Sequence, residues 1–330
     1  MTILITGATG FIGSFIAEEA VRRGMEVWAA VRKTSSKTYL SHPSIHFIEL
    51  HLNDKKQLIE QLRPLKLDYV VHAAGVTKSL HSEDFFATNT QGTRNLAEAI
   101  LELEMPLKRF VFVSSLSIFG PVRETRPYQE IKDSDTPQPN TAYGKSKLQA
   151  EAVLDAMPSL PCITLRPTGV YGPREKDYFM MVKSIKSHTD FAVGYKPQIL
   201  TFVYVLDVVQ AVFLALDHGV NGKKYFLSDG HDYDSRTFSD LIRSDLGNPW
   251  MVRIKAPLWL LRIITACGEW IGHLTGRVTA LNNDKYHIMK QRNWRCDITP
   301  AVNELGYHPQ YDLVKGVKLT VAWYKENKWI

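Results

Sequence analysis

Residues 2–13 read TILITGATGFIG, the pattern of a strand, a glycine-rich turn and the start of a helix. The apolar run Ile3–Thr6 predicts a buried strand, and Phe11–Arg23 has the apolar spacing of a helix. Three glycines between the strand and the helix form a GxxGxxG pattern. A glycine-rich turn from an amino-terminal strand into a helix presents free backbone N–H groups, which bind the pyrophosphate of a dinucleotide. The other interpretation is a tight turn that needs only positive φ.

Each glycine of the pattern has an expected task. Gly7 permits the tight turn, Gly10 lets the backbone approach a pyrophosphate, and Gly13 allows close packing of the helix. We therefore expect the turn to lie along a cofactor through Gly7, Thr9, Gly10, Phe11 and Ile12.

Strand-like and helical stretches alternate after the turn. The expected elements are Glu26–Val31, Lys55–Leu62, Tyr69–Ala73, Ser82–Glu104, Phe110–Ser114, a helix after Tyr143, Phe202–Val205 and Asp207–Asp217. This order predicts an α/β fold with a doubly wound parallel (Rossmann) sheet and a smaller, interleaved carboxyl-terminal substrate lobe. We expect residues 1–165 to bind the dinucleotide, with 200–220 returning to that part, and 166–330 to be mainly the substrate lobe.

The end of the second strand bears on the choice of cofactor. A dinucleotide fold normally places an acid there, on the ribose 2′-hydroxyl, whereas this chain has Arg32 and Lys33. Two cations suit a 2′-phosphate, so the sequence favours NADP(H) over NAD(H). The alternative is a pair of solvated surface cations.

Candidate catalytic groups follow two later elements. Tyr143 and Lys147 are four residues apart and share one helix face. An ammonium beside a phenol lowers the pKa of the phenol toward neutral pH, where it can exchange a proton. Ser114 and Ser115 stand at the carboxyl end of an apolar strand, the edge where open parallel sheets bind ligands. A hydroxyl there can polarise a substrate carbonyl, or it can simply cap the strand end.

Several spaced motifs together resemble the extended short-chain dehydrogenases/reductases, which include NAD-dependent epimerases and dehydratases. The motifs are TGATGFIG (6–13), VHAAG (71–75), NTQGTRNL (89–96), FVFVSSLSIFG (110–120), YGKSK (143–147), LRPTGVYGP (165–173) and FVYVLDVVQA (202–211). The resemblance implies that Tyr143 is the general acid/base, that Lys147 lowers its pKa and binds the nicotinamide ribose, and that Ser115 orients the carbonyl. The resemblance favours Ser115 over Ser114 as this serine, because Ser115 stands five residues before Gly120, the usual interval in the family.

The same resemblance places further residues along the cofactor. Ala73, Ala74 and Gly75 are expected beside it, and Pro167 to Val170 against its carboxamide end. His51 stands where an Asp near the adenine is common, although the backbone of Leu52 could still serve there.

Two departures bear on the substrate. Sugar-nucleotide members of the family usually carry an Asn within the segment that matches 166–169 and an Arg near position 200, where this chain has Gly169 and Leu200. The pattern is closer to dihydroflavonol-4-reductases and 3β-hydroxysteroid dehydrogenases. It implies an enzyme that interconverts a ketone and a secondary alcohol on a mostly apolar, ring-containing small molecule. The alternatives are a sugar-nucleotide epimerase or dehydratase and a dinucleotide-sensing regulator without turnover.

Composition and charge bear on whether the protein binds nucleic acid, a metal or a membrane. Apolar residues make up 45% of the 330 and charged residues 22%, which is ordinary globular composition. The net charge of +6 resides in residues 251–295, and no nucleic-acid-binding module is recognisable.

The three cysteines lack ligand spacing, so we expect buried thiols and no metal site. No stretch is long enough to span a membrane, which predicts a cytoplasmic protein and leaves its oligomeric state open.

The segment 257–274, PLWLLRIITACGEWIGHL, predicts one more helix. Its polar residues form a narrow stripe of Arg262, Thr265, Glu269 and His273. The remaining wide apolar face needs an apolar partner. Packing into the substrate lobe as a pocket wall is the first expectation. Reversible contact with an anionic membrane is the second, with a basic collar formed by Arg253, Lys255, Arg262 and Arg277.

Overall fold

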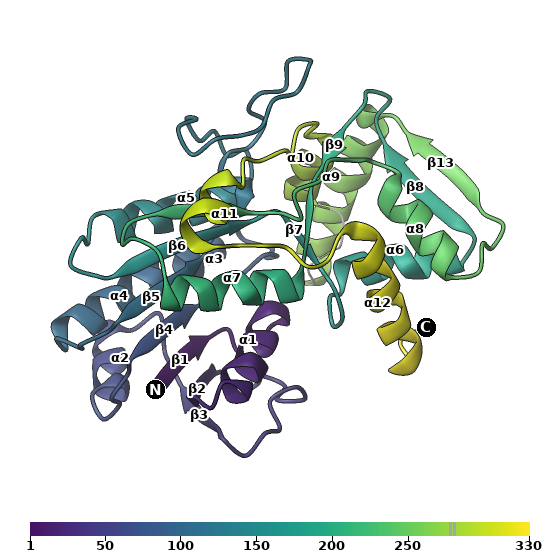
Figure 1. Ribbon diagram of the computed structural model, residues 1–330. Coiled ribbons are helices and arrows are strands. Elements are labelled where there is room, and N and C mark those ends of the chain that lie inside the picture. The colour runs from purple at the N-terminus through teal and green to yellow at the C-terminus, as the bar shows by residue number, and fades with distance from the viewer. Residues whose placement is uncertain (277–278, 280–281) are drawn as a thin grey trace.

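A computed structural model describes residues 1–276, 279 and 282–330 (Figure 1). Its main feature is a seven-stranded sheet in the order β11-β6-β5-β4-β1-β2-β3, in which every neighbouring pair is parallel. The strands are β1 (Thr2–Thr6), β2 (Glu26–Val31), β3 (Ile45–Glu49), β4 (Tyr69–His72), β5 (Arg109–Val113), β6 (Cys162–Pro167) and β11 (Lys224–Leu227). The predicted doubly wound α/β fold is confirmed.

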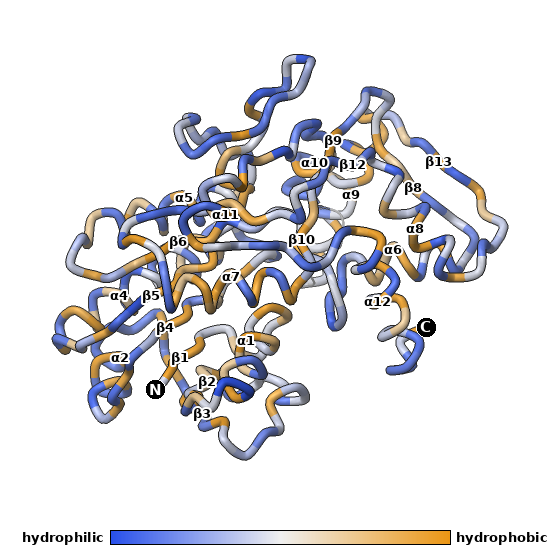
Figure 2. The backbone as a smooth tube through the Cα atoms, viewed as in Figure 1, coloured by the Kyte–Doolittle hydropathy of each residue, from blue (hydrophilic) through white to orange (hydrophobic). Residues whose placement is uncertain are grey.

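Helices cover both faces of this sheet. They are α1 (Phe11–Arg22), α2 (Lys55–Leu62), α3 (Ser82–Phe85), α4 (Gly92–Glu102), α5 (Ala142–Asp155), α7 (Val205–Asp217) and α11 (Thr299–Leu305). Successive strand residues point to opposite faces, so Ile3 and Ile5 join the core beneath α1 and α7, while Leu4 joins the core beneath α2, α4 and α5. Figure 2 shows hydrophobic residues recurring along α7, which lies over the sheet.

The carboxyl-terminal lobe has its own core. Its helices are α6 (Asp177–Lys186), α8 (Thr237–Asp245), α9 (Leu258–Thr275), α10 (Asn283–Lys290) and α12 (Leu313–Glu326). Its two-stranded sheets pair β7 (Gly169–Tyr171) with β10 (Phe202–Tyr204), β8 (Thr189–Val193) with β13 (Val252–Ala256), and β9 (Ile199–Leu200) with β12 (Tyr233–Asp234). Aromatic side chains from several of these elements, including Tyr171, Phe202, Phe238 and Tyr324, fill that core.

Several local expectations were wrong. The edge strand β3 was missed because its residues IHFIE mix polar and apolar side chains and pair only with β2. The single helix expected over 82–104 is interrupted by a π-helical turn at Phe86–Gln91. The strand expected at 202–205 does form, as β10, and pairs with β7 outside the main sheet. Cys162 and Cys296 are buried, but Cys267 is exposed.

Helix α9 forms as predicted, but most of its large apolar residues lie outside the core. It buries Leu261, Thr265 and Gly272, and much of its wide apolar face is exposed to solvent. The expectation that this face packs into the lobe is therefore wrong for most of the helix, whereas the first turn does line a cavity through Leu258 and Trp259. Arg277 of the expected basic collar lies outside the described residues. No described helix is both long enough and apolar enough to cross a bilayer.

Candidate active site

The glycine turn after β1 is held so closely that side chains would not fit. Gly7 has a φ of 70°, and a Cβ at this position would lie 2.7 Å from the backbone of Ala73. A Cβ on Gly13 would lie 2.1 Å from the Gly7 carbonyl oxygen. Helix α1 then begins after Gly10 with no side-chain cap and no acid in its first turn. Its N-terminal N–H groups are therefore available to an anion.

A groove of about 480 Å³ runs from this turn along the carboxyl ends of the strands. Most of the predicted cofactor residues line it: Gly7, Thr9, Gly10, Arg32, Leu52, Ala73, Ala74 and Gly75. Phe11 lines the adjoining cavity together with Thr9 and Gly10. The side chains of Ile12 and Val170 instead pack against the core, so only their backbones could face a ligand. The groove fits an extended dinucleotide whose pyrophosphate lies at the start of α1.

Lys147 and Asn89 hold the inner end of the groove. The buried Lys147 ammonium donates to the Val113 carbonyl (2.8 Å), and a Cβ on Gly75 would lie 3.3 Å from its Nζ. Asn89 donates to the Val76 carbonyl (3.0 Å) and accepts from the Val76 N–H (2.7 Å). Burial lowers the pKa of Lys147 to about 8. The Lys147 ammonium therefore lies behind Gly75, a residue that lines the groove.

The first turn of α5 positions Tyr143. Thr141 caps the helix by accepting from the Gly144 N–H (3.0 Å), and Asp284 of α10 accepts from the Tyr143 N–H (3.3 Å). Burial raises the pKa of Tyr143 to about 12, and a hydrogen bond with Ser115 lowers it in part. This direction is opposite to the expected lowering by Lys147, whose ammonium is turned to a backbone carbonyl. Burial therefore favours the protonated form of the phenol, which can donate a hydrogen bond but is a weaker acid than a free tyrosine.

The structure separates the two serines. Ser114 is buried and donates to Glu151 (2.6 Å), so its hydroxyl is engaged within the protein. Ser115 accepts from the Ser117 N–H (3.1 Å) and lines a cavity open to a ligand. Ser115 is thus the serine that can reach a substrate, beside Tyr143.

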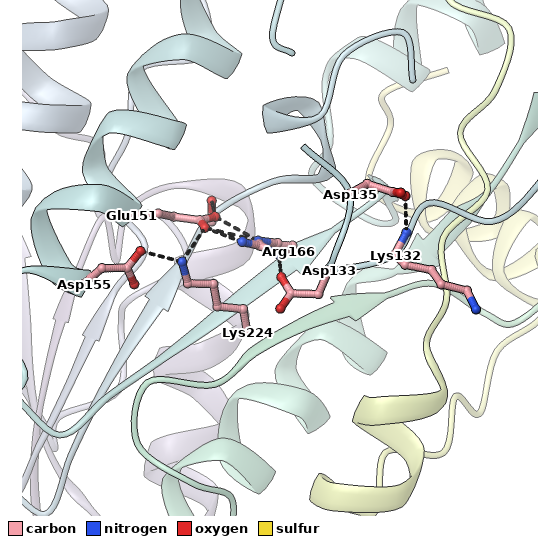
Figure 3. Close-up of polar contacts among 8 residues, drawn as sticks. Lys132, Asp133, Asp135, Glu151, Asp155, Arg166 and Lys224 are labelled. Atoms are coloured by element: carbon pink, nitrogen blue, oxygen red, sulfur yellow. Dashed lines mark hydrogen bonds and ion pairs between the residues drawn. The ribbon is translucent and has the colours of Figure 1, made fainter. Parts of the chain in front are cut away.

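A buried ion-pair network supports this arrangement (Figure 3). Glu151 of α5 pairs with Arg166 of β6 at 2.6 Å, and both side chains are almost fully buried. Lys224 of β11 lies 3.5 Å from Glu151 and 2.7 Å from Asp155. Arg166 also pairs with the more exposed Asp133. The network joins α5 to two strands of the sheet, and through Ser114 it reaches the end of β5.

The cavity beyond Ser115 is small and mainly apolar. It has a volume of about 320 Å³. Its wall comes from Pro167 and several elements of the carboxyl-terminal lobe, including Tyr178, Met181, Phe191, Val193, Leu200, Phe202, Phe238, Ile288, Met289 and Trp294. None of its lining residues within the described chain carries a formal charge.

Sequence reasoning missed three supporting residues. Asn89 lies in a motif that was recognised, yet no task was assigned to it. Glu151 could have been suspected as a polar residue on the buried face of α5, one turn beyond Lys147. Asp284 gave no signal, because it lies more than a hundred residues from the Tyr143 N–H that it binds.

The chain matches known proteins over most of its length. Residues 3–228 match the model of the NAD dependent epimerase/dehydratase family. The chain belongs to this family. The predicted family is therefore confirmed, and with it the class of nicotinamide-dependent enzymes that the family comprises.

The similar proteins span the whole chain. A UDP-N-acetyl-alpha-D-glucosaminuronate decarboxylase of Bacillus cytotoxicus is 26% identical, over 98% of this chain and 97% of that protein. A decarboxylating sterol-4-alpha-carboxylate 3-dehydrogenase of Candida albicans is 25% identical, over 99% and 98%. A dTDP-glucose 4,6-dehydratase of Bacillus anthracis, solved in complex with NAD, has the same fold with a TM-score of 0.79 at 20% identity, over 100% and 98%.

Proposed function

We propose that this protein is an NADP(H)-dependent oxidoreductase that interconverts a ketone and a secondary alcohol on a mostly apolar, ring-containing small molecule. The observation that carries the proposal is the uncharged cavity next to Ser115 and Tyr143. Burial of apolar ligand surface is favoured there, whereas a diphosphate in this cavity would lack a cationic partner. In this proposal residues 1–165, with 200–220, bind the dinucleotide, and 166–330 mainly bind the substrate.

Each catalytic side chain has one task. The nicotinamide, when bound, supplies or accepts the hydride. Ser115 donates a hydrogen bond to the carbonyl oxygen and polarises it. Tyr143 gives its proton to the oxygen as negative charge develops on it. Lys147 adds positive charge at the inner end of the groove, where it can bind the ribose and stabilise the phenolate that remains.

Cofactor preference rests on Arg32. This exposed residue lines the groove, and its N–H donates to Ser35 Oγ (3.2 Å), which also lines the groove. Within the described chain no carboxylate forms an ion pair with the Arg32 guanidinium, so it can pair with a 2′-phosphate. This arrangement supports NADP(H) over NAD(H).

One observation favours the sugar-nucleotide alternative. A second cavity of about 260 Å³ shares Val193, Gln198 and Met289 with the apolar cavity. Three cations line it, namely Lys196, Lys290 and Arg292. A nucleotide-sugar could place its diphosphate there and its sugar beside Ser115. The curated relatives named above include a protein of each substrate type, one with a UDP-sugar in its name and one with a sterol.

A substrate panel separates the two candidates. The purified protein is incubated with NADPH or NADH and with steroid ketones, flavonoid-like ketones or nucleotide-sugars, and cofactor absorbance is followed. We expect NADPH consumption with an apolar ketone. Conversion of a nucleotide-sugar without net cofactor consumption would support the alternative and refute the proposal. A regulator without turnover would bind the cofactor and convert none of the compounds.

A further inference from the structure

Helix α9 exposes a large apolar surface. Six of its large apolar residues are between 41% and 66% exposed: Trp259, Ile263, Ile264, Trp270, Ile271 and Leu274. The neighbouring pair of strands β8 and β13 adds exposed Phe191 and Ile254. Scattered single apolar residues are normal on a surface, but a helix that turns most of its large apolar side chains outward indicates a binding face.

Basic residues surround this face. Arg262 lies on α9 itself, is exposed, and has no ion-pair partner among the described residues. Lys290 is exposed on α10, which packs against α9. Lys145 is exposed in the first turn of α5, whose backbone is bonded to Asp284 of α10. Lys255 adds a fourth at the end of β13, whereas Arg253 is already paired with Asp240.

The apolar face adjoins the entrance to the candidate active site. Leu258 and Trp259, in the first turn of α9, line the second cavity described above. That cavity shares Val193, Gln198 and Met289 with the cavity at Ser115, so the first turn of α9 lies near the site. At its other end α9 approaches the segment before α3, where His273 and His81 have ring centroids 5.8 Å apart.

We infer that α9, together with the β8–β13 edge, docks reversibly on an anionic lipid bilayer. Exposed Trp, Ile and Leu would enter the headgroup region, and Arg262, Lys255, Lys290 and Lys145 would contact anionic headgroups. The helix lies on the bilayer and does not cross it, in agreement with the absence of a spanning helix among the described ones. A lipophilic molecule could then pass from the bilayer into the second cavity.

Charge favours a bilayer over a second copy of the chain. A symmetric dimer through this face would bring each copy's cations close to the other's, because the same patch faces itself across a twofold axis. The only acidic residue of α9 is Glu269, which is half-buried. An anionic lipid surface complements the basic residues directly, and each basic residue near such a surface contributes about 1 kcal/mol.

Vesicle co-sedimentation tests the inference without requiring any turnover, so its failure would leave the proposed function untouched. The full chain is mixed with vesicles of phosphatidylcholine alone or of phosphatidylcholine with phosphatidylglycerol, at low and high salt. We expect binding that needs phosphatidylglycerol and weakens with salt. The double variant Trp270→Gln/Leu274→Gln should lower the partition coefficient by roughly tenfold or more, because two apolar side chains are removed from the interface. Arg262→Gln should lower it about fivefold, the equivalent of about 1 kcal/mol.

The matched control is Val314→Gln/Leu319→Gln, which changes two exposed apolar residues of α12. It should bind vesicles like the unmodified chain, and circular dichroism should show that every variant is folded. Absence of binding to anionic vesicles at low salt would overturn the inference. So would equal binding by the α9 variant and the unmodified chain, or a dimer in light scattering that only the α9 variant dissociates.

Discussion

Helices α7 and α9 are both rich in apolar residues, yet the fold treats them in opposite ways. Helix α7 buries nine of its thirteen residues between α1 and the sheet. Helix α9 has eighteen residues and buries Leu261, Thr265 and Gly272. The first is a structural element of the dinucleotide-binding part, and the second is a surface. Apolar character therefore indicates that a helix needs a partner, but only the three-dimensional structure shows whether the protein itself provides that partner.

The largest contrast is expected from truncating one aromatic side chain on each helix. Phe213→Ala on α7 leaves a cavity in a closely packed core and should lower the free energy of unfolding by roughly 3–5 kcal/mol. Trp270→Ala on α9 removes a side chain that is 65% exposed and should change it by no more than about 0.5 kcal/mol. Urea denaturation measures both. Similar losses for the two variants would mean that α9 is packed like α7, which would remove the basis of the membrane inference.

Ion pairs provide a second contrast, between the main sheet and the carboxyl-terminal lobe. Glu151→Gln leaves the buried Arg166 without its main counter-charge and should cost on the order of 3 kcal/mol. Asp240→Asn breaks the solvent-exposed pair with Arg253 and should cost about 1 kcal/mol or less. The same denaturation curves compare the variants. A small loss for Glu151→Gln would show that the network in Figure 3 does not fix α5 to the sheet.

Acid should lower the stability of the folded protein through the buried ring of His72. Its ring is fully buried between Thr6 (2.6 Å) and Thr93 (2.8 Å), and burial lowers its pKa to about 3, with Lys147 contributing. Because the unfolded chain takes up a proton near pH 6.5 and the folded chain does not, stability is lost as pH falls from about 6.5 toward 3.

The expected contribution of this group between pH 7 and pH 5 is roughly 2 kcal/mol. His72→Gln should flatten the pH dependence of unfolding over that interval. His273→Gln, on exposed α9, is the matched control and should leave the dependence as it is. If His72→Gln retained the full slope, the neutral state assigned to the His72 ring would be wrong.

The last contrast concerns the rim of the dinucleotide groove, where the expected effect is on cofactor binding and not on stability. A charge-assisted contact of about 1.5 to 3 kcal/mol between Arg32 and a 2′-phosphate should favour NADP(H) by about tenfold or more. Arg32→Asp should reverse the preference, measured by fluorescence titration with both cofactors. Lys33→Asp, one residue further from the strand, should change it less. Equal affinity of the unmodified protein for NADPH and NADH would refute this role of Arg32.

Local sequence signals predicted local features well. The glycine turn, α1 and the helix that carries Tyr143 and Lys147 are determined largely by residues close in sequence. Strands β1 and β5 pair with distant segments, but their nearly continuous apolar runs identify them as buried strands. Strand β3 was not predicted, because as an edge strand it carries a mixed pattern. The orientation of α9 could not be predicted either, because a helical wheel defines the faces of a helix but not the neighbour that each face contacts.

The site shows the same limit. The serine, tyrosine and lysine could be singled out from spacing and family resemblance. The pKa of Tyr143 could not, because it depends on burial by distant segments and on where the Lys147 ammonium points. The contact of Asp284 with the start of α5 likewise joins parts of the chain that no sequence pattern relates.

In the proposed reaction Tyr143 supplies the proton, and the rest of the site binds the cofactor and the substrate. Tyr143→Phe removes only the hydroxyl, so the most direct measurement is its turnover of an apolar ketone from the panel, together with its affinity for NADPH. We predict a loss of turnover by about 10²- to 10⁴-fold with cofactor affinity unchanged. Turnover equal to that of the unmodified protein would contradict the assignment of Tyr143 as the general acid.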